Sequence, residues 1–143
     1  MGELARVNNI DLWWQDFGNK LDPSVLLIMG ANANALYWDQ RFIDELVKNK
    51  YHVVIFDNRD VGKSTWFNKE PLLAKLGKFV PVSVSRKLVS YAFKSLVNDD
   101  GNFEMPEGKG AKYDLNDMAR DAIGLMDYLE ITKAHIVGAS MGG

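Results

Sequence analysis

Apolar and polar positions alternate along the chain in blocks that predict strands and helices in turn. Residues 5–17 mix apolar and polar side chains around Asn8-Asn9, a pattern that predicts a β-hairpin. The runs 25–29 (VLLIM), 52–56 (HVVIF) and 134–137 (AHIV) are almost wholly apolar. Such runs are typical of strands that are buried on both faces of a parallel sheet.

Helical spacing appears between these strands. The first helix is expected over residues 38–48, with Asn49 as its C-terminal cap. A second helix is expected after Asp114, which is a suitable N-cap with Asp117 three residues on. The apolar residues that keep helical spacing from there are Leu115, Met118, Ala119, Ala122, Ile123, Met126 and Leu129.

This order of elements predicts the α/β class, with a mostly parallel sheet, an N-terminal antiparallel hairpin and flanking helices. Residues 66–112 form a longer connection than a strand and a helix need, and their apolar spacing predicts an inserted helical pair. Lysines and arginines are frequent in this insert, so a lid, or a surface that touches anionic lipid or a partner, is the alternative to a merely solvated helical pair.

Composition removes several function classes. The 143 residues are 47% hydrophobic and carry a net charge of −2, so they show no basic footprint for nucleic acid. The chain has no cysteine, which excludes disulfides, thiolate nucleophiles and cysteine zinc sites. No apolar run reaches the length of a signal peptide or a membrane span, so a soluble, cytoplasmic protein is expected.

The last apolar run leads directly into Gly138-Ala139-Ser140-Met141-Gly142, a G-x-S-x-G pattern. This pattern marks a nucleophilic serine when it forms a sharp turn between a strand and a helix. Gly138 and Gly142 would be needed because such a turn brings backbone segments too close together for side chains. The alternative is a glycine-rich loop with an incidental serine.

A second loop, Gly30 to Ala33, follows the apolar run 25–29. A serine acyl-transfer enzyme needs two N–H donors for the developing oxyanion. One comes from the residue after the serine, here Met141, and the other from a loop after an earlier strand. The small residues at 30–33 suit that role, although an ordinary turn between a strand and a helix is the alternative.

A third loop, residues 57–65, ends in Gly62-Lys63-Ser64-Thr65 and raises the alternative of a phosphate-binding loop. That motif requires a glycine five residues before Gly62, and Asp57 stands there instead. A carboxylate at that corner would repel phosphate. We therefore favour a structural loop in which Arg59 pairs with Asp57 or Asp60.

Taken in their order along the chain, these three motifs resemble the first half of an α/β-hydrolase, in the branch of aclacinomycin methylesterase-like carboxylic-ester hydrolases. The resemblance covers most of the chain except residues 66–112. It implies that Ser140 is the nucleophile, that Ala31 and Met141 donate to the oxyanion, and that Gly30 shapes the loop. It implies a small-molecule ester as substrate and no metal or organic cofactor.

The family order places the triad acid and histidine after the serine, yet three residues follow Ser140 here. His52 and His135 are expected at the amino ends of their parallel strands, whereas the serine is expected at the carboxyl end of its strand. The two histidines should therefore lie at the other end of the sheet from Ser140. We therefore expect a partial α/β-hydrolase domain, truncated at its C-terminus, with little triad-dependent turnover. Its parts are 1–65 with the hairpin, oxyanion loop, first helix and strand, 66–112 with the insert, and 113–143 with the second helix and nucleophile elbow.

A non-catalytic interaction module is the alternative from another class. A sheet that stops at residues 134–137 would present an apolar strand edge, which favours pairing with another chain. Self-association through this edge is then expected. Contact with a membrane surface and binding of nucleic acid are not favoured by the sequence.

Overall fold

The computed structural model describes residues 2–67, 84 and 112–143. The elements below belong to one compact unit, formed by Met1–Lys69 and Tyr113–Gly143. The expected helical pair in the insert 66–112 therefore falls outside the described residues, apart from 66, 67, 84 and 112. No helix in the described ranges is long and apolar enough to cross a membrane.

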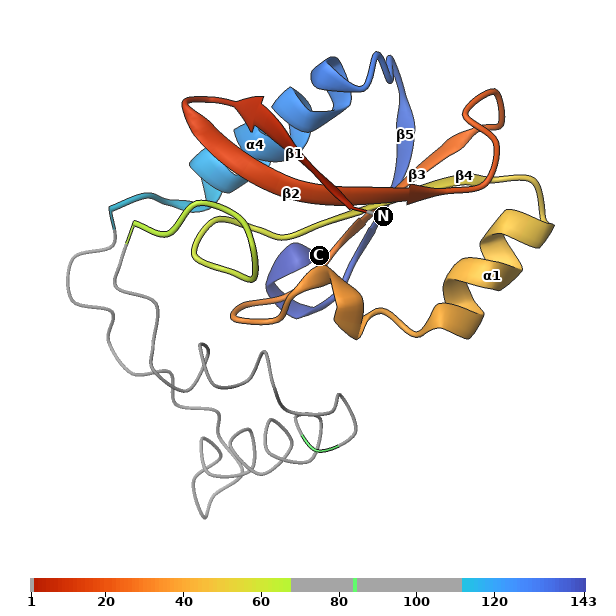
Figure 1. Ribbon diagram of the computed structural model, residues 1–143, viewed down its shortest axis with the longest axis horizontal. Coiled ribbons are helices and arrows are strands. Elements are labelled where there is room, and N and C mark those ends of the chain that lie inside the picture. The colour runs from red at the N-terminus through yellow and green to blue at the C-terminus, as the bar shows by residue number, and fades with distance from the viewer. Residues whose placement is uncertain (1, 68–83, 85–111) are drawn as a thin grey trace. The chain divides into compact units, whose positions relative to one another are not determined.

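Five strands form one sheet in the order β1-β2-β4-β3-β5 (Figure 1). The chain builds it from β1 (Glu3–Val7), β2 (Ile10–Phe17), β3 (Ser24–Ile28), β4 (His52–Phe56) and β5 (Ala134–Gly138). The pairs β1–β2 and β2–β4 are antiparallel, whereas β3 is parallel to both β4 and β5. The expected α/β class with an N-terminal hairpin is confirmed, and the sheet as a whole is mixed.

The hairpin turn is made by Asn8 and Asn9, whose φ angles are 46° and 64°. A two-residue turn with both φ angles positive has the twist that suits a β-hairpin. Asparagine tolerates this left-handed region better than most residues, so no glycine is needed here.

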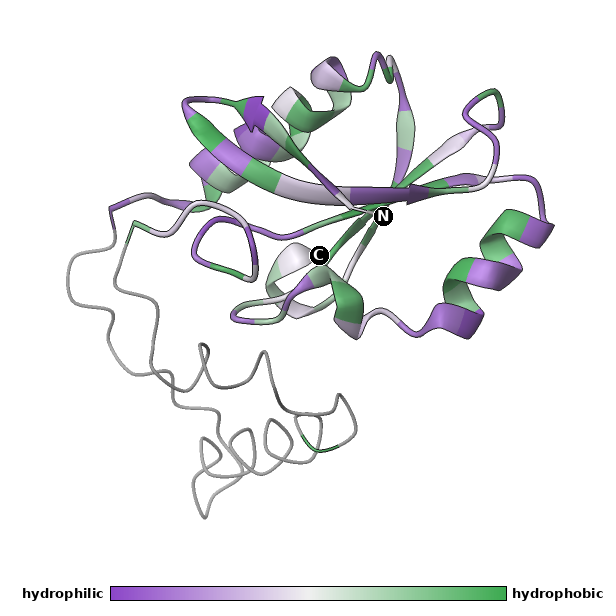
Figure 2. Ribbon diagram, in the orientation of Figure 1, coloured by the Kyte–Doolittle hydropathy of each residue, from purple (hydrophilic) through white to green (hydrophobic). Residues whose placement is uncertain are grey.

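Helices lie on opposite faces of the sheet (Figures 1 and 2). Alternate side chains of the central strands pack against these helices in two separate clusters. Leu26 and Val54 belong to a buried cluster with Leu125 of α4 (Leu115–Tyr128). Val25 and Val53 belong to a second cluster with Ile43 of α1 (Gln40–Lys48). Both faces of β3 and β4 are thus buried, as their continuous apolar runs predicted.

The first helix begins later than its pattern suggested. A 3₁₀ turn, η1 (Ala35–Tyr37), precedes it, and the side chain of Asp39 caps α1 by accepting from the Arg41 N–H. The C-terminal cap is Asn49, as predicted. The first two residues of the expected helix 38–48 therefore lie outside it, because Asp39 is the N-cap and precedes the first helical residue.

The second helix begins at its expected N-cap Asp114, which forms a capping box with Asp117, but its buried face includes only some of the apolar residues at helical spacing. Leu115 and Ile123 belong to that spaced set, yet they are 63% and 59% exposed. The buried positions are Asp121, Ala122 and Leu125. An acidic residue thus lies on the core-facing stripe, which shifts the helix phase away from the one that apolar residues alone suggest.

The last strand differs from its expected burial on both faces. Within the described part of the chain, β5 pairs with β3 and lies at the sheet edge. Its side chains at His135 and Ile136 are exposed, the latter by 54%. Because β5 has, among the described residues, a neighbouring strand on one edge alone, its side chains lack flanking side chains from a second strand, and this explains their exposure.

Candidate active site

Ser140 lies on a sharp turn at the carboxyl end of β5, where the 3₁₀ helix η2 (Ser140–Gly142) begins. Its φ angle is 56°, in the left-handed region that a serine adopts at a cost. The preceding Ala139 is held by its N–H, which donates to the Ile28 carbonyl of β3 at 3.0 Å. The turn therefore presents an exposed serine on a constrained backbone, as a nucleophile elbow does.

The two glycines of the pattern are required by close backbone approaches. A Cβ atom on Gly138 would lie 2.0 Å from the carbonyl oxygen of Gly142. A Cβ on Gly142 would lie 2.4 Å from the carbonyl oxygen of Ile28. Real Cβ atoms essentially never come this close to backbone, so any side chain at either position would open the turn.

The structure brings the expected oxyanion loop to Ser140. A Cβ on Gly30 would lie 2.9 Å from both the Ser140 Cβ and the Ala139 carbonyl oxygen, so the glycine permits the two loops to touch. Ala31 and Met141 line one small cavity of about 100 Å³. In the described part of the chain, the backbone hydrogen bonds of this loop leave the Ala31 N–H unused.

Asp57, directly after β4, holds the segment that follows this loop. Its buried carboxylate accepts from the Ala35 N–H at 2.8 Å and from the Lys63 N–H at 3.0 Å. Burial raises the pKa of the Asp57 carboxyl above its ordinary value, and the two N–H donors oppose that rise. The neighbouring Asn58 amide donates to the Met29 carbonyl at 3.0 Å, one residue before Gly30.

The Gly62-Lys63-Ser64-Thr65 segment is built into the fold. The Ser64 hydroxyl donates to the Asp57 carbonyl at 2.6 Å and accepts from the Trp13 N–H at 2.9 Å. Gly62 has a φ of 53°, and a Cβ there would meet the Asp57 carboxylate. These contacts favour a structural role for the segment over the phosphate-binding alternative, because the serine hydroxyl already has its partners.

The expected partner of Arg59 was wrong. Its guanidinium binds Asp121 of α4 through two hydrogen bonds, of 2.7 and 2.8 Å, and both side chains are buried. The rings of Phe67 and Tyr113 lie 5.3 and 5.0 Å from the guanidinium carbon. The nearby carboxylate of Asp57 already accepts hydrogen bonds from backbone N–H groups. Arg59 therefore pairs with the carboxylate that α4 supplies.

Both histidines lie at the opposite end of the sheet from Ser140, as expected. His52 opens β4 opposite Ser24, the first residue of β3, whereas Gly138 at the elbow pairs with Ile28, the last. The ring of His135 packs edge-on against Tyr51, with centroids 5.8 Å apart. Neither ring can serve Ser140 from these positions.

Sequence reasoning missed two residues that organise the site, Asp121 and Asn58. Asp121 had a signal, since it occurs between Met118 and Leu125 on the stripe that faces the core. A charged residue on such a stripe usually has a buried partner. Asn58 had no such signal, because its bond to the Met29 carbonyl joins residues 29 positions apart.

A family model described as "alpha/beta hydrolase fold" matches residues 23–143. Among curated proteins, the chain is similar to rhodomycin D methylesterase DauP from Streptomyces sp. (strain C5), with 23% identity over 135 residues. It is also similar to rhodomycin D methylesterase DnrP from Streptomyces peucetius, with 24% identity. Each match covers 94% of this chain and 32% of the relative, so the chain spans about a third of these proteins.

Solved structures show the same fold. An enol-lactonase from Burkholderia xenovorans LB400 matches with a TM-score of 0.63 at 21% identity, covering 98% of this chain and 38% of that one. Epoxide hydrolase A from Mycobacterium thermoresistibile matches with a TM-score of 0.61 at 21% identity, covering 98% and 31%. The expected resemblance to α/β-hydrolases and to carboxylic-ester hydrolases is thereby confirmed.

Proposed function

Because the chain belongs to the alpha/beta hydrolase fold family, we propose that it carries the nucleophile elbow and oxyanion loop of a serine hydrolase. The supporting observation is the backbone of Ser140, whose φ of 56° holds an exposed hydroxyl beside the oxyanion loop. Strain at such a position is retained where the surrounding structure enforces it, and active sites are where it gathers.

The proposed reaction is acyl transfer from a carboxylic ester. The Ser140 Oγ attacks the carbonyl carbon while a general base takes the hydroxyl proton. The Ala31 and Met141 N–H groups donate to the oxyanion that forms, since both line the same cavity beside the elbow. The alcohol then leaves, and water releases the acid from the serine.

We propose that the general base is a histidine other than the two in this sequence. His52 and His135 lie at the far end of the sheet, and an unactivated serine is a weak nucleophile. The matched methylesterases are about three times as long as the part that this chain covers. The 143 residues are therefore proposed to be the N-terminal part of the catalytic domain, with low turnover on their own.

The substrate class follows from the relatives' names. Both curated relatives are named methylesterases, which favours a small-molecule carboxylic ester over an epoxide. The oxyanion donors support the same class, because they stabilise a negative oxygen that an ester forms during attack. The insert over residues 66–112 remains a proposed lid or helical surface feature.

Chemical rescue tests this proposal on the chain as it stands. Hydrolysis of p-nitrophenyl acetate is measured with rising imidazole, which can replace the missing base. We expect an imidazole-dependent rate above that of Ser140→Ala, and an acetyl group on Ser140 by mass spectrometry. Gly143→Ala is the matched control, because a Cβ there would make ordinary contacts of 3.5 Å or more. Equal imidazole-dependent rates in the chain and in Ser140→Ala would refute the proposed nucleophile.

A second candidate function is an interaction module that associates through β5. The observation that favours it is the exposed edge of this strand, with Ile136 at 54% exposure. Sedimentation at several concentrations tests it, and Ile136→Lys should shift an oligomer toward monomer. A monomer at all concentrations would count against this candidate.

A further inference from the structure

A serine, a histidine and an aspartate also meet at the end of the sheet that lies away from Ser140. Ser24 opens β3 and His52 opens β4, and the parallel register places them side by side. Asp16 lies on β2 opposite Val54, two residues along from His52. Because side chains alternate along a strand, all three point to the α4 side of the sheet.

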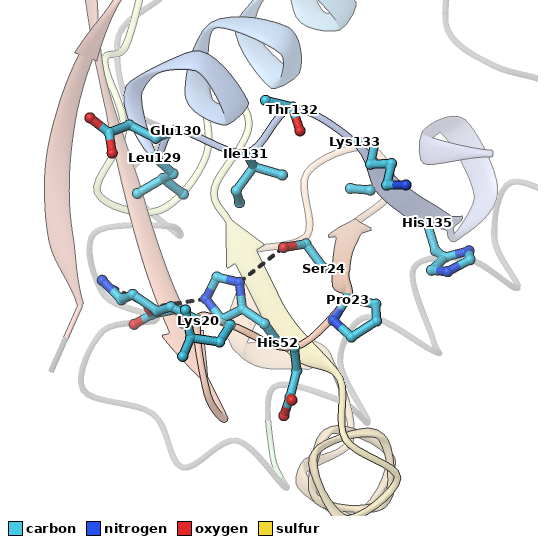
Figure 3. A pocket seen from close by; sticks show the side chains of 14 residues that line it. Lys20, Pro23, Ser24, His52, Leu129, Glu130, Ile131, Thr132, Lys133 and His135 are labelled. Atoms are coloured by element: carbon cyan, nitrogen blue, oxygen red, sulfur yellow. Dashed lines mark hydrogen bonds and ion pairs between the residues drawn. The ribbon is translucent and has the colours of Figure 1, made fainter.

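The Ser24 hydroxyl, the His52 ring and the Asp16 carboxylate form a chain of two hydrogen bonds. The Ser24 Oγ lies 3.1 Å from the His52 Nδ1, and the His52 Nε2 lies 3.2 Å from the Asp16 Oδ2 (Figure 3). An ionised carboxylate can only accept, so the proton of a neutral His52 ring is on Nε2. The Nδ1 lone pair is then free to accept from the Ser24 hydroxyl. The histidine is thus oriented as a general base toward this serine.

Asp16 is suited to hold that ring. Burial alone would raise the pKa of its carboxyl, but the hydrogen bond from His52 and the charge of Lys20 outweigh burial and lower the pKa below its ordinary value. The Lys20 Nζ lies 3.4 Å from the Asp16 Oδ2. A carboxylate that stays ionised fixes the tautomer of the ring and stabilises its protonated form during proton transfer.

A pocket opens onto this cluster. Its volume is about 660 Å³, within the range of small-molecule sites. Leu129 and Ile131, from the α4–β5 connection, give it an apolar wall, and Ser24 and His52 lie on the other side (Figure 3). His52 is buried and Ser24 is half-buried, so the serine is the reactive group that a ligand would meet.

We propose that Ser24 is a second nucleophile, which takes an acyl group from a small activated ester bound in this pocket. The Ser24 Oγ forms a bond to the carbonyl carbon and its proton passes to the His52 Nδ1. The bond from that carbon to the leaving oxygen then breaks, and His52 returns the proton to the departing alcohol. The products are the alcohol and a Ser24 ester, which water cleaves slowly.

The test uses the full 143-residue chain with Ser140→Ala, so that the elbow cannot react. The protein is treated with p-nitrophenyl acetate, and tandem mass spectrometry locates the acetyl group. We expect an adduct on Ser24 that is absent from the Ser24→Ala, Ser140→Ala double variant. His52→Gln should slow its formation about 100-fold or more, as removal of a general base does. Asp44→Asn, at an exposed position of α1 that does not line the pocket, should leave the rate unchanged.

Asp16→Asn gives an independent arm, because an amide keeps the shape of the carboxylate without its charge. It should slow acetylation of Ser24 while circular dichroism and the unfolding midpoint at neutral pH show a folded protein. If His52→Gln fails to fold, this variant decides the outcome. Acetyl groups confined to lysines, or a Ser24 rate that neither His52→Gln nor Asp16→Asn changes, would overturn the proposal. Because the adduct is located by residue, this result is independent of the fate of Ser140.

Discussion

The Arg59 guanidinium and the Asp121 carboxylate form a buried two-point ion pair that joins the loop after β4 to the middle of α4. Their side chains are 7% and 2% exposed. Arg59 lines the cavity shared by Ala31 and Met141, so the pair connects the helix to the surroundings of the candidate oxyanion donors. The position of that cavity wall therefore depends on a contact between residues 62 positions apart.

Removal of one partner of this ion pair should be costly. Asp121→Ala should lower the free energy of unfolding by about 3–5 kcal/mol, because it leaves the Arg59 charge buried without compensation. Denaturation by urea measures the change. The double variant Arg59→Met, Asp121→Leu should lose much less, since no charge remains buried. Arg120→Ala breaks the exposed Arg120–Asp117 pair and serves as the control, for which we expect little change.

The elbow should reject a methyl group at Gly138. Gly138→Ala should lower the free energy of unfolding by about 1–3 kcal/mol or more, because the new Cβ would overlap the Gly142 backbone. The same variant should lose the imidazole-dependent acetylation of Ser140. Gly143→Ala lies in the same turn, yet its Cβ would meet ordinary contacts, so both properties should be kept. Equal losses in the two variants would contradict this account of the turn.

The Tyr113 phenol should lose its proton at a higher pH than an ordinary tyrosine does. Burial and a hydrogen bond with Asp60 raise its pKa to about 12, while the Arg59 charge opposes the rise. The folded state then holds this proton above the pH at which the unfolded chain loses it. The stability that Tyr113 contributes should thus be complete below about pH 10 and be lost as pH rises through about 12.

Absorbance at alkaline pH, combined with thermal unfolding, measures this effect. Tyr113→Phe should remove the late-titrating phenol and flatten the fall in stability between pH 10 and 12. Tyr128→Phe is the control, because that side chain is 50% exposed. The same titration curve in the chain and in Tyr113→Phe would show that the phenol is not held as described.

The Gly62-Lys63-Ser64 segment should respond to mutation as a structural element. Ser64→Ala should cost about 1–3 kcal/mol, since it leaves the buried Trp13 N–H without its acceptor. Lys63→Ala should cost about 0.5–1 kcal/mol through loss of its contact with the Trp13 ring, at 5.4 Å. Calorimetry should detect no ATP binding in the unchanged chain or in Lys63→Ala. Tight ATP binding that Lys63→Ala abolishes would restore the phosphate-binding alternative.

Much of the local structure followed from short-range pattern. The strand His52–Phe56 has the bounds that its apolar run predicted, and Asp114 caps α4 as its position suggested. The turn at Asn8-Asn9 needs nothing beyond those two residues. Each of these features depends on contacts within a few positions of the chain, which a sequence displays directly.

Burial and charge pairing could not be predicted in this way. The exposed side of β5 depends on how many neighbours a strand has, and the phase of α4 depends on the buried partner of Asp121. Leu115 and Ile123 are apolar and exposed, which local spacing cannot reveal. Such features are decided by packing and charge pairing between segments that lie far apart in the sequence.

The candidate site divides along the same line. By itself, the sequence determined that a serine follows a buried-strand pattern between two glycines, with small residues after an earlier strand, because the chemistry of a sharp turn restricts residue type. The tertiary structure alone decided that Gly30 touches Ser140, that Asp57 binds Ala35 just after that loop, and that His52 faces Ser24. Those contacts arise when parallel strands bring their like ends together, a juxtaposition that no local pattern contains.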